Sequence, residues 1–195
     1  RTIMTRLFTR IAAASLMALV STAAFAAEPE NTLVISLKDG EVTIALRPDL
    51  APKHVEQIKA LTRKGAYDNV VFHRVIDGFM AQTGDVQFGN SAKDFNPAQA
   101  GMGGSDLPDI KAEFSQEPFV RGTVGMARAQ SPDSANSQFF ITFGDASFLN
   151  GQYTVVGNVE SGMELVDKIK RGDEAQNGVV SDPDKMVKVK VAADK

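Results

Sequence analysis

Residues 70–85 read VVFHRVIDGFMAQTGD and contain the strongest indication of how this chain folds. β-Branched and aromatic residues open the segment, and such residues favour a strand. Asp77–Gly78 is a turn signal, and Phe79–Thr83 reads as a second short extended run. The segment therefore predicts two short strands joined by a tight turn.

Alternation within these strands places an arginine beside apolar and amide side chains. Side chains two residues apart in a strand share a face, so Phe72, Arg74 and Ile76 are predicted to point the same way. Met80 and Gln82 share a face of the second run for the same reason. A fixed cation beside a large apolar side chain and an amide is unusual for a hairpin that only builds a core, so this face is a candidate binding surface.

The first 26 residues differ in kind from the rest of the chain. Residues 1–10 hold three arginines and no acid, residues 11–25 form an apolar run, and residues 24–26 read Ala-Phe-Ala, a cleavage pattern. This layout is typical of a secretory signal peptide. A mitochondrial presequence is the alternative, but the charges stop abruptly before the apolar run. We therefore expect residues 1–26 to be a signal peptide and residues 27–195 to form one domain.

The charge balance and the lack of cysteine exclude several classes of function. Removal of residues 1–26 takes three of the 21 basic residues and none of the 24 acids, which moves the net charge from −3 to −6. An acidic balance argues against nucleic acid or an anionic membrane as the main partner. The chain has no cysteine, which excludes disulfides, thiolate chemistry and cysteine-ligated zinc. We expect no nucleic-acid partner and no stable membrane insertion after leader cleavage.

Alternating apolar and polar residues predict further strands along the chain. Thr32–Leu37 and Glu41–Leu46 flank the turn signal Asp39–Gly40, a pattern that favours a hairpin. Residues 84–118 are rich in Gly, Pro, Asn and Asp and read as one long loop region. The remaining predicted strands are residues 122–129, 138–143, 153–159 and 186–191.

Two helices are predicted among these strands. The first begins at Pro52, which suits a first helical turn, and ends at Gly65. The second opens with a capping box at Ser161–Glu164 and ends at Gly172. About eight mostly antiparallel strands and two helices predict a mainly β fold, in which a closed eight-stranded antiparallel barrel removes the sheet edges and two α-helices cap it.

The residues alone favour peptide binding over most kinds of catalysis. No glycine-rich phosphate loop lies between a strand and a helix, and no serine lies in a nucleophile-elbow pattern. His54 is expected to be a solvated or boundary residue on the first helix and His73 to lie in the core, so no metal site is assigned. Gln138 and Phe140 share a strand face, which completes an apolar, amide-lined groove around Arg74. Such a groove predicts binding of an extended peptide.

Four segments in order make this interpretation more specific. They are FHRVIDGFMAQTGD at 72–85, GTVGMARA at 122–129, SANSQFFITF at 134–143 and SFLNGQYTVVG at 147–157. Together they resemble the cyclophilin family of peptidyl-prolyl cis-trans isomerases, and the resemblance runs from about Thr32 to Val191. With the predicted leader, the chain is similar to bacterial periplasmic members, so we expect a periplasmic location.

The resemblance implies an enzyme that rotates X–Pro peptide bonds and assists the folding of exported proteins. Its partners are then proline-containing segments of unfolded or folding exported proteins, and we expect a monomer that uses no cofactor and no metal. Arg74 matches the catalytic arginine of the family, and Gln82 matches a polar group that orients it. The implied substrate-binding residues are Phe79, Met80, Ala127, Arg128, Gln138, Phe140, Phe148, Leu149 and Tyr153.

Three positions depart from the best-known eukaryotic members of the family. Arg128 stands in place of an Asn, Phe148 in place of a Trp, and Tyr153 in place of a His. The family uses mainly backbone groups at the first position, so peptide binding should survive there. Weak cyclosporin binding is expected, because Phe148 has no N–H to donate. A peptide-binding chaperone on the same barrel is the alternative function, but an intact Arg74 favours the enzyme, since binding alone does not need it.

We predict that export removes residues 1–26 and leaves Ala27 as the first residue of the mature protein. The reason is the succession of charged, apolar and Ala-x-Ala segments at the start of the chain. N-terminal sequencing of protein recovered from the periplasm of an expressing bacterium checks this. Recovery of uncleaved chain from the cytosol would contradict it.

Overall fold

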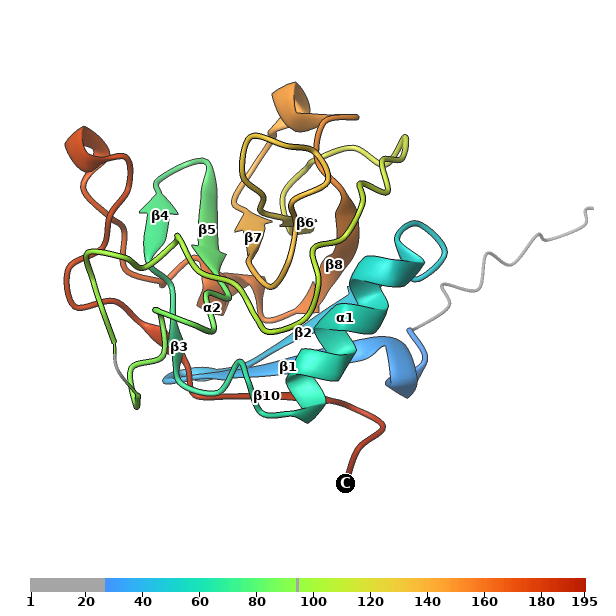
Figure 1. The fold of residues 1–195 in the computed structure, drawn as a ribbon, viewed down its shortest axis with the longest axis horizontal. Coiled ribbons are helices and arrows are strands. Elements are labelled where there is room, and N and C mark those ends of the chain that lie inside the picture. Colours follow the sequence, from blue (N-terminus) through green and yellow to red (C-terminus); the bar gives the residue numbers. More distant parts are fainter. Residues whose placement is uncertain (1–26, 94) are drawn as a thin grey trace, which may run out of the picture.

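The computed structural model describes residues 27–93 and 95–195, so the predicted signal peptide lies outside the described residues. Figure 1 shows a β-rich molecule with one prominent helix. The strands are β1 (Thr32–Leu37), β2 (Gly40–Leu46), β3 (Val70–Val71), β4 (Arg74–Ile76), β5 (Met80–Thr83), β6 (Thr123–Met126), β7 (Phe139–Thr142), β8 (Val155–Ser161), β9 (Lys185–Met186) and β10 (Lys188–Val191). The helices are α1 (Pro52–Arg63) and α2 (Met163–Val166), with 3₁₀ helices η1 (Pro29–Asn31), η2 (Ser147–Leu149) and η3 (Glu174–Gln176).

Eight strands form one strongly curled antiparallel sheet in the order β10-β1-β2-β8-β6-β7-β5-β4. The two short strands β3 and β9 pair separately, again antiparallel. Because β3 directly precedes β4 in the chain and β9 directly precedes β10, this pair joins the two edges of the curled sheet. The predicted mainly β fold on eight antiparallel strands is confirmed. Its closure combines a half-barrel with a bridging strand pair.

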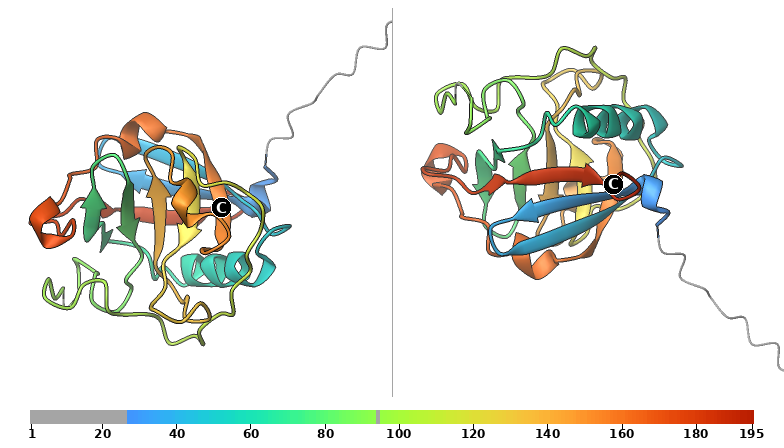
Figure 2. Two further views of the ribbon diagram at one scale, coloured as in Figure 1. Left: turned by 90° about the horizontal axis from the view of Figure 1, so that it is seen from above. Right: turned by 90° about the horizontal axis from the view of Figure 1, so that it is seen from below.

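The two predicted helices cover the sheet from opposite sides (Figure 2). Helix α1 turns Val55, Ile58 and Leu61 into the main core, and their three-residue spacing places them on one face of the helix. Each buried side chain of this size contributes about 1.5–3 kcal/mol to stability relative to an exposed position. Gly65, with φ of 70°, stands just beyond the end of α1, where its missing Cβ permits the left-handed turn.

The strand that carries the arginine is interrupted at Phe72–His73, between β3 and β4. The prediction that Phe72 shares a face with Arg74 is wrong. Phe72 packs in the main core together with Val70 and Val75. The interruption shifts the alternation by one residue, so Phe72 turns inward while Arg74 faces the opposite side.

The predicted capping box at Ser161 does not form. Ser161 is the last residue of β8, and its hydroxyl shares a 2.6 Å hydrogen bond with the hydroxyl of Thr43. Gly162 stands at the N-cap of α2 instead, with φ of 85°. A Cβ there would lie 2.6 Å from the backbone oxygen of Glu41, so the close passage of β2 requires glycine at this corner.

A second, smaller core supports the other face of β5 and β7. Its buried members are Met80, Phe119, Phe140, Ala146, Leu149 and Val155. The rings of Phe119 and Phe140 stack with centroids 5.7 Å apart. Gly125 on β6 makes room for them, because a Cβ there would lie 2.6 Å from each ring. This core is the base on which the groove around Arg74 is built.

The N-terminus of α1 is capped by a residue distant in the sequence. Ala51 at the N-cap offers no side-chain acceptor, but the Glu113 carboxylate accepts from the backbone N–H groups of Lys53 (3.2 Å) and His54 (3.1 Å). A carboxylate at this position satisfies orphan donors and complements the helix dipole. Glu113 Oε2 also lies 2.6 Å from His54 Nδ1. The expectation of a solvated or boundary His54 is wrong, since its side chain is 0% exposed.

We predict that Glu113→Ala lowers the free energy of unfolding by about 2–4 kcal/mol. The variant loses a helix cap and leaves a buried imidazole without its partner. Urea unfolding followed by circular dichroism measures the change. Glu56→Ala is the matched control, because Glu56 is exposed on the same helix, and it should change stability by less than about 0.5 kcal/mol. Equal effects of the two substitutions would remove Glu113 from the capping role.

Candidate active site

Arg74 is fixed by partners at both ends of its guanidinium. Its Nε donates to the backbone oxygen of Asn177 (2.9 Å), and its Nη2 donates to Asn177 Oδ1 (2.9 Å). Its Nη1 donates to Gln82 Oε1 at 3.3 Å. These bonds occupy three of the five N–H groups of a guanidinium. The described residues thus leave two N–H groups of Arg74 available to a ligand.

The bond to Gln82 begins a chain of hydrogen bonds that runs in one direction. Gln82 Nε2 donates to Gln138 Oε1 (3.0 Å), and Gln138 Nε2 donates to the backbone oxygens of Gly101 (2.9 Å) and Gly103 (2.8 Å). The register that pairs Arg74 with Gln82, and Gln82 with Phe140, brings three strands together here. The chain ties the arginine on β4 to the loop that follows β5.

The far end of this chain is anchored by a buried carboxylate. Asp85 accepts from the backbone N–H groups of Gly101 (2.7 Å) and Gly103 (3.0 Å). It also accepts from those of Gln87 (3.1 Å) and Phe88 (2.9 Å). Four backbone donors hold this one side chain in place, so the segment 101–103 has a fixed position although it belongs to a long loop.

Arg74 forms one wall of a cavity of about 290 Å³, which we call the Arg74 cavity. Ten of the eleven site residues predicted from the sequence line it. They are Arg74, Phe79, Met80, Gln82, Ala127, Arg128, Phe140, Phe148, Leu149 and Tyr153. Gln138, the eleventh, lines a neighbouring polar cavity of about 460 Å³ and orients Gln82 from there. The residues that the sequence predicts for one site therefore come together.

Two aromatic residues and a second arginine close the cavity opposite Arg74. The Phe148 side chain is 64% exposed and leans on Phe79, with ring centroids 5.3 Å apart. The Tyr153 ring meets Phe140 edge-on at 6.0 Å, and the Arg128 guanidinium lies 4.4 Å above the Tyr153 ring. Arg128 also donates to the backbone oxygen of Gln152 at 2.8 Å. The side chain of Arg128 thus fastens one cavity wall to another, in addition to any backbone role.

His73, directly before Arg74, is buried as predicted. Burial lowers the pKa of His73 from 6.5 to about 4, although the nearby Asp85 opposes the shift. The imidazole is therefore neutral at neutral pH. Because the unfolded chain binds this proton first, the contribution of His73 to stability is lost as the pH falls from about 6.5 to about 4. The ring packs under the loop, where a Cβ on Gly101 would lie 3.0 Å from it.

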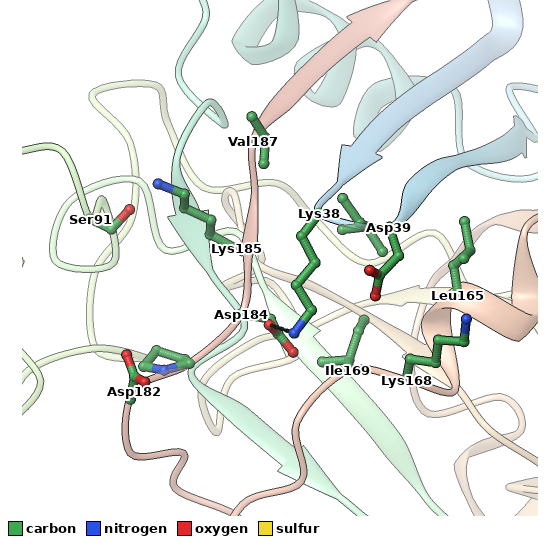
Figure 3. Close-up of a pocket in the computed structure, with 12 residues that line it drawn as sticks. Lys38, Asp39, Ser91, Leu165, Lys168, Ile169, Asp182, Asp184, Lys185 and Val187 are labelled. Carbon is green, nitrogen blue, oxygen red and sulfur yellow. Dashed lines mark hydrogen bonds and ion pairs between the residues drawn. The ribbon is translucent and has the colours of Figure 1, made fainter.

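A further cavity of about 340 Å³ lies at a different place on the barrel (Figure 3). It is lined by side chains of both charges, including Lys38, Lys185 and Asp184, and the Lys38–Asp184 ion pair spans 2.7 Å. None of its lining residues belongs to the Arg74 cavity. Its balanced charges favour no particular ligand, whereas the Arg74 cavity combines two arginines with an apolar floor and no carboxylate.

The described residues were also compared with the requirements of a metal site and of a membrane-spanning helix. Within residues 27–93 and 95–195, no three metal-ligating His, Asp or Glu side chains lie close enough together to hold an ion. None of the helices in this part of the chain is both long enough and apolar enough to cross a bilayer.

Sequence reasoning missed Asn177, which supplies two of the three acceptors of Arg74. Asn177 follows η3 and has φ of 56°, in the left-handed region that asparagine tolerates better than most residues. Asn177–Gly178 is a turn signal in the sequence, but a turn signal carries no information about a partner 103 residues away.

Known proteins are similar to this chain in sequence and in fold. The sequence profile of the family described as "Cyclophilin type peptidyl-prolyl cis-trans isomerase/CLD" matches residues 32–191. A "Probable peptidyl-prolyl cis-trans isomerase" of Brucella suis is 65% identical over 188 residues, which cover 94% of this chain and 95% of the relative.

Two solved structures share the fold. A cyclophilin from Hirschia baltica gives a TM-score of 0.72 at 25% identity, with 87% of this chain and 76% of that chain covered. A cyclophilin-type isomerase from Cryptosporidium parvum, solved in the presence of the dipeptide Ala-Pro, gives a TM-score of 0.69 at 26% identity. The match covers 82% of this chain and 98% of that one.

Proposed function

The chain belongs to the cyclophilin-type peptidyl-prolyl cis-trans isomerases, and we propose that Arg74 is the residue with which this enzyme accelerates rotation about X–Pro bonds. One observation carries the proposal. A guanidinium held by three hydrogen bonds forms a wall of a cavity whose other walls include Phe79, Met80, Phe140 and Leu149. An apolar ring beside a fixed cation is the arrangement that a prolyl substrate needs.

The chemistry of the imide bond explains why a cation helps. Rotation about an X–Pro bond has a barrier of about 18–20 kcal/mol, because it breaks amide resonance. In the twisted transition state the proline nitrogen regains a lone pair. A guanidinium beside that nitrogen stabilises the lone pair and gains nothing comparable from the planar ground state, so it lowers the barrier.

The remaining residues position the substrate. The apolar floor of the Arg74 cavity holds the proline ring, so the preceding carbonyl is the part that rotates. Backbone groups at Ala127 hold the adjoining peptide, and Gln138 orients Gln82 beside Arg74. Burial lowers the pKa of Arg74 below its ordinary value, yet an arginine remains protonated in proteins. The reaction therefore needs no proton transfer and no covalent intermediate.

The substrates are proline-containing peptide segments, and we infer from the sequence of residues 1–26 that they belong to exported proteins folding in the periplasm. The acidic balance of the mature chain is compatible with free diffusion among such clients as a monomer. A chaperone that only binds peptides would need the apolar cavity but not a cation with two N–H groups left for a ligand. The geometry of Arg74 thus favours catalysis.

We predict that Arg74→Ala lowers kcat and kcat/KM on a short X–Pro peptide by about a hundredfold to a thousandfold. The interaction that is lost should be stronger in the transition state than in the ground state. A coupled assay of proline isomerisation measures it, with thermal unfolding as a check on folding. Arg74→Lys should restore little, because an ammonium lacks the planar fork. Turnover at the wild-type rate by Arg74→Ala would remove the residue from the mechanism.

Two further variants test whether activity depends on where the Arg74 guanidinium is held or only on the net charge of the protein. Arg47→Ala removes the same charge from a surface ion pair with Asp49, and it should leave kcat unchanged. Asn177→Gly keeps the left-handed backbone and its carbonyl but deletes the Oδ1 that accepts from Arg74 Nη2. It should lower kcat by an intermediate factor, about three- to tenfold, the range expected for one lost hydrogen bond.

We predict that the protein binds cyclosporin weakly and that Phe148→Trp strengthens this binding. Family resemblance implies that cyclosporin occupies the substrate groove and accepts an indole N–H at this position. Phe148 lies on the rim of the Arg74 cavity but has no donor. Its smaller ring and missing bond should cost about 1–3 kcal/mol, or about ten- to a hundredfold in Kd. Isothermal titration of both forms gives the ratio, and equal affinities would show that Phe148 does not contact the inhibitor.

A further inference from the structure

A hollow of about 260 Å³ lies beyond Arg74, and we call it the flanking cavity. Its walls come from two loops, one after β5 and one after η3, and both loops lie at the same end of the molecule in Figures 1 and 2. The larger apolar side chains that line it are Phe95, Pro97, Met102, Val179, Val180 and Pro183. None of them belongs to the site predicted from the sequence.

The rim of this cavity is unusually apolar for a surface. Met102 is 76% exposed and Val179 is 49% exposed. Together with Phe148 on the Arg74 cavity, they make up three of the six large exposed apolar side chains among the described residues. Scattered exposed apolar residues need no explanation, but a cluster around a hollow marks a binding surface.

The flanking cavity is continuous with the groove that takes the substrate. Arg74 and Gln82 line both cavities, so the hydrogen-bonded pair they form is the ridge between them. A peptide whose proline lies in the Arg74 cavity can cross this ridge in extended form. Side chains two residues apart then share a face, which brings a second side chain over the flanking cavity.

The charges of the lining residues define the occupant. Among the described residues that line the flanking cavity, none is a carboxylate, and the guanidinium of Arg74 is already held by Asn177 and Gln82. A basic side chain would therefore gain no partner of opposite sign and would lose water. A large uncharged apolar side chain would instead remove Met102 and Val179 from solvent.

We propose that the flanking cavity is a second substrate subsite, which accepts a large apolar side chain, such as Leu, Met or Phe, close to the proline in the client chain. The proposal rests on the proposed role of the groove at Arg74 as the substrate site. It makes the enzyme selective for prolines in apolar segments, which are the segments that an unfolded chain exposes.

The test uses a short Ala-Pro host peptide in which each of the three residues on either side of the proline is replaced in turn by Leu. At one of these six positions, the one whose side chain lies over the flanking cavity, Leu should raise kcat/KM about five- to thirtyfold over the Ala parent. This is the range expected for partial burial of a leucine. Val179→Ser and, separately, Met102→Ser should bring this Leu-to-Ala ratio close to one. Because each variant is compared with itself on two peptides, a general loss of activity does not change the ratio.

Val187→Ser is the matched control. Val187 is a valine of similar exposure, 43%, but it lines the cavity of Figure 3. It should keep the wild-type ratio. The subsite is overturned if no position gives a gain, if the gain survives both Val179→Ser and Met102→Ser, or if Val187→Ser abolishes it equally.

Arg74→Ala on the Ala parent separates the two proposals. Loss of turnover in that variant, together with no gain from Leu at any position in the wild type, overturns the subsite and leaves the role of Arg74 intact. Undiminished turnover overturns the role of Arg74 and with it the premise of the subsite.

Discussion

The site depends on one constraint: a guanidinium can only donate hydrogen bonds. Arg74 therefore obliges Gln82 to present its oxygen, which leaves the Gln82 amide nitrogen to donate to Gln138. The Gln138 amide nitrogen then meets the two glycine carbonyls of the 101–103 loop. Each amide has a single orientation that satisfies all its neighbours, and a fully satisfied polar network is rigid. The half-buried guanidinium of Arg74 thus sets the orientation of the two glutamine amides, and its hydrogen bonds in turn hold the guanidinium in position.

This constraint makes two loops part of the candidate active site. The segment 101–103 is held from one side by Gln138 and from the other by the Asp85 carboxylate. Gly103 belongs there because a Cβ would collide with that carboxylate. At the other end of the guanidinium, Asn177 presents both a backbone and a side-chain oxygen from its left-handed conformation. A flexible long side chain is held in one position by acceptors from opposite directions.

The sequence predicted the parts of the site that follow strand alternation. Gln82 lies within β5 and Gln138 directly precedes β7, where a period of two still assigns faces, and Phe139 turns into the main core on the opposite side. The same rule failed at Phe72, because the strand break next to His73 leaves no local trace in a run of strand-forming residues. Asn177 and Glu113 could not be predicted, since each acts on a residue far away in the chain, and only the folded topology brings them together.

The burial of Arg74 also gives a reason why the proposed mechanism uses arginine rather than lysine at this position. Partial desolvation disfavours a charged group and lowers the pKa of the guanidinium. An ammonium in the same place starts from a lower pKa and can lose its proton to the same effect, whereas a guanidinium keeps its charge. The residual cost of keeping a cation away from water is relieved when a lone pair forms beside it. In the proposed mechanism that lone pair exists only while the imide is twisted, so the guanidinium interacts more strongly with the rotating peptide than with the planar one.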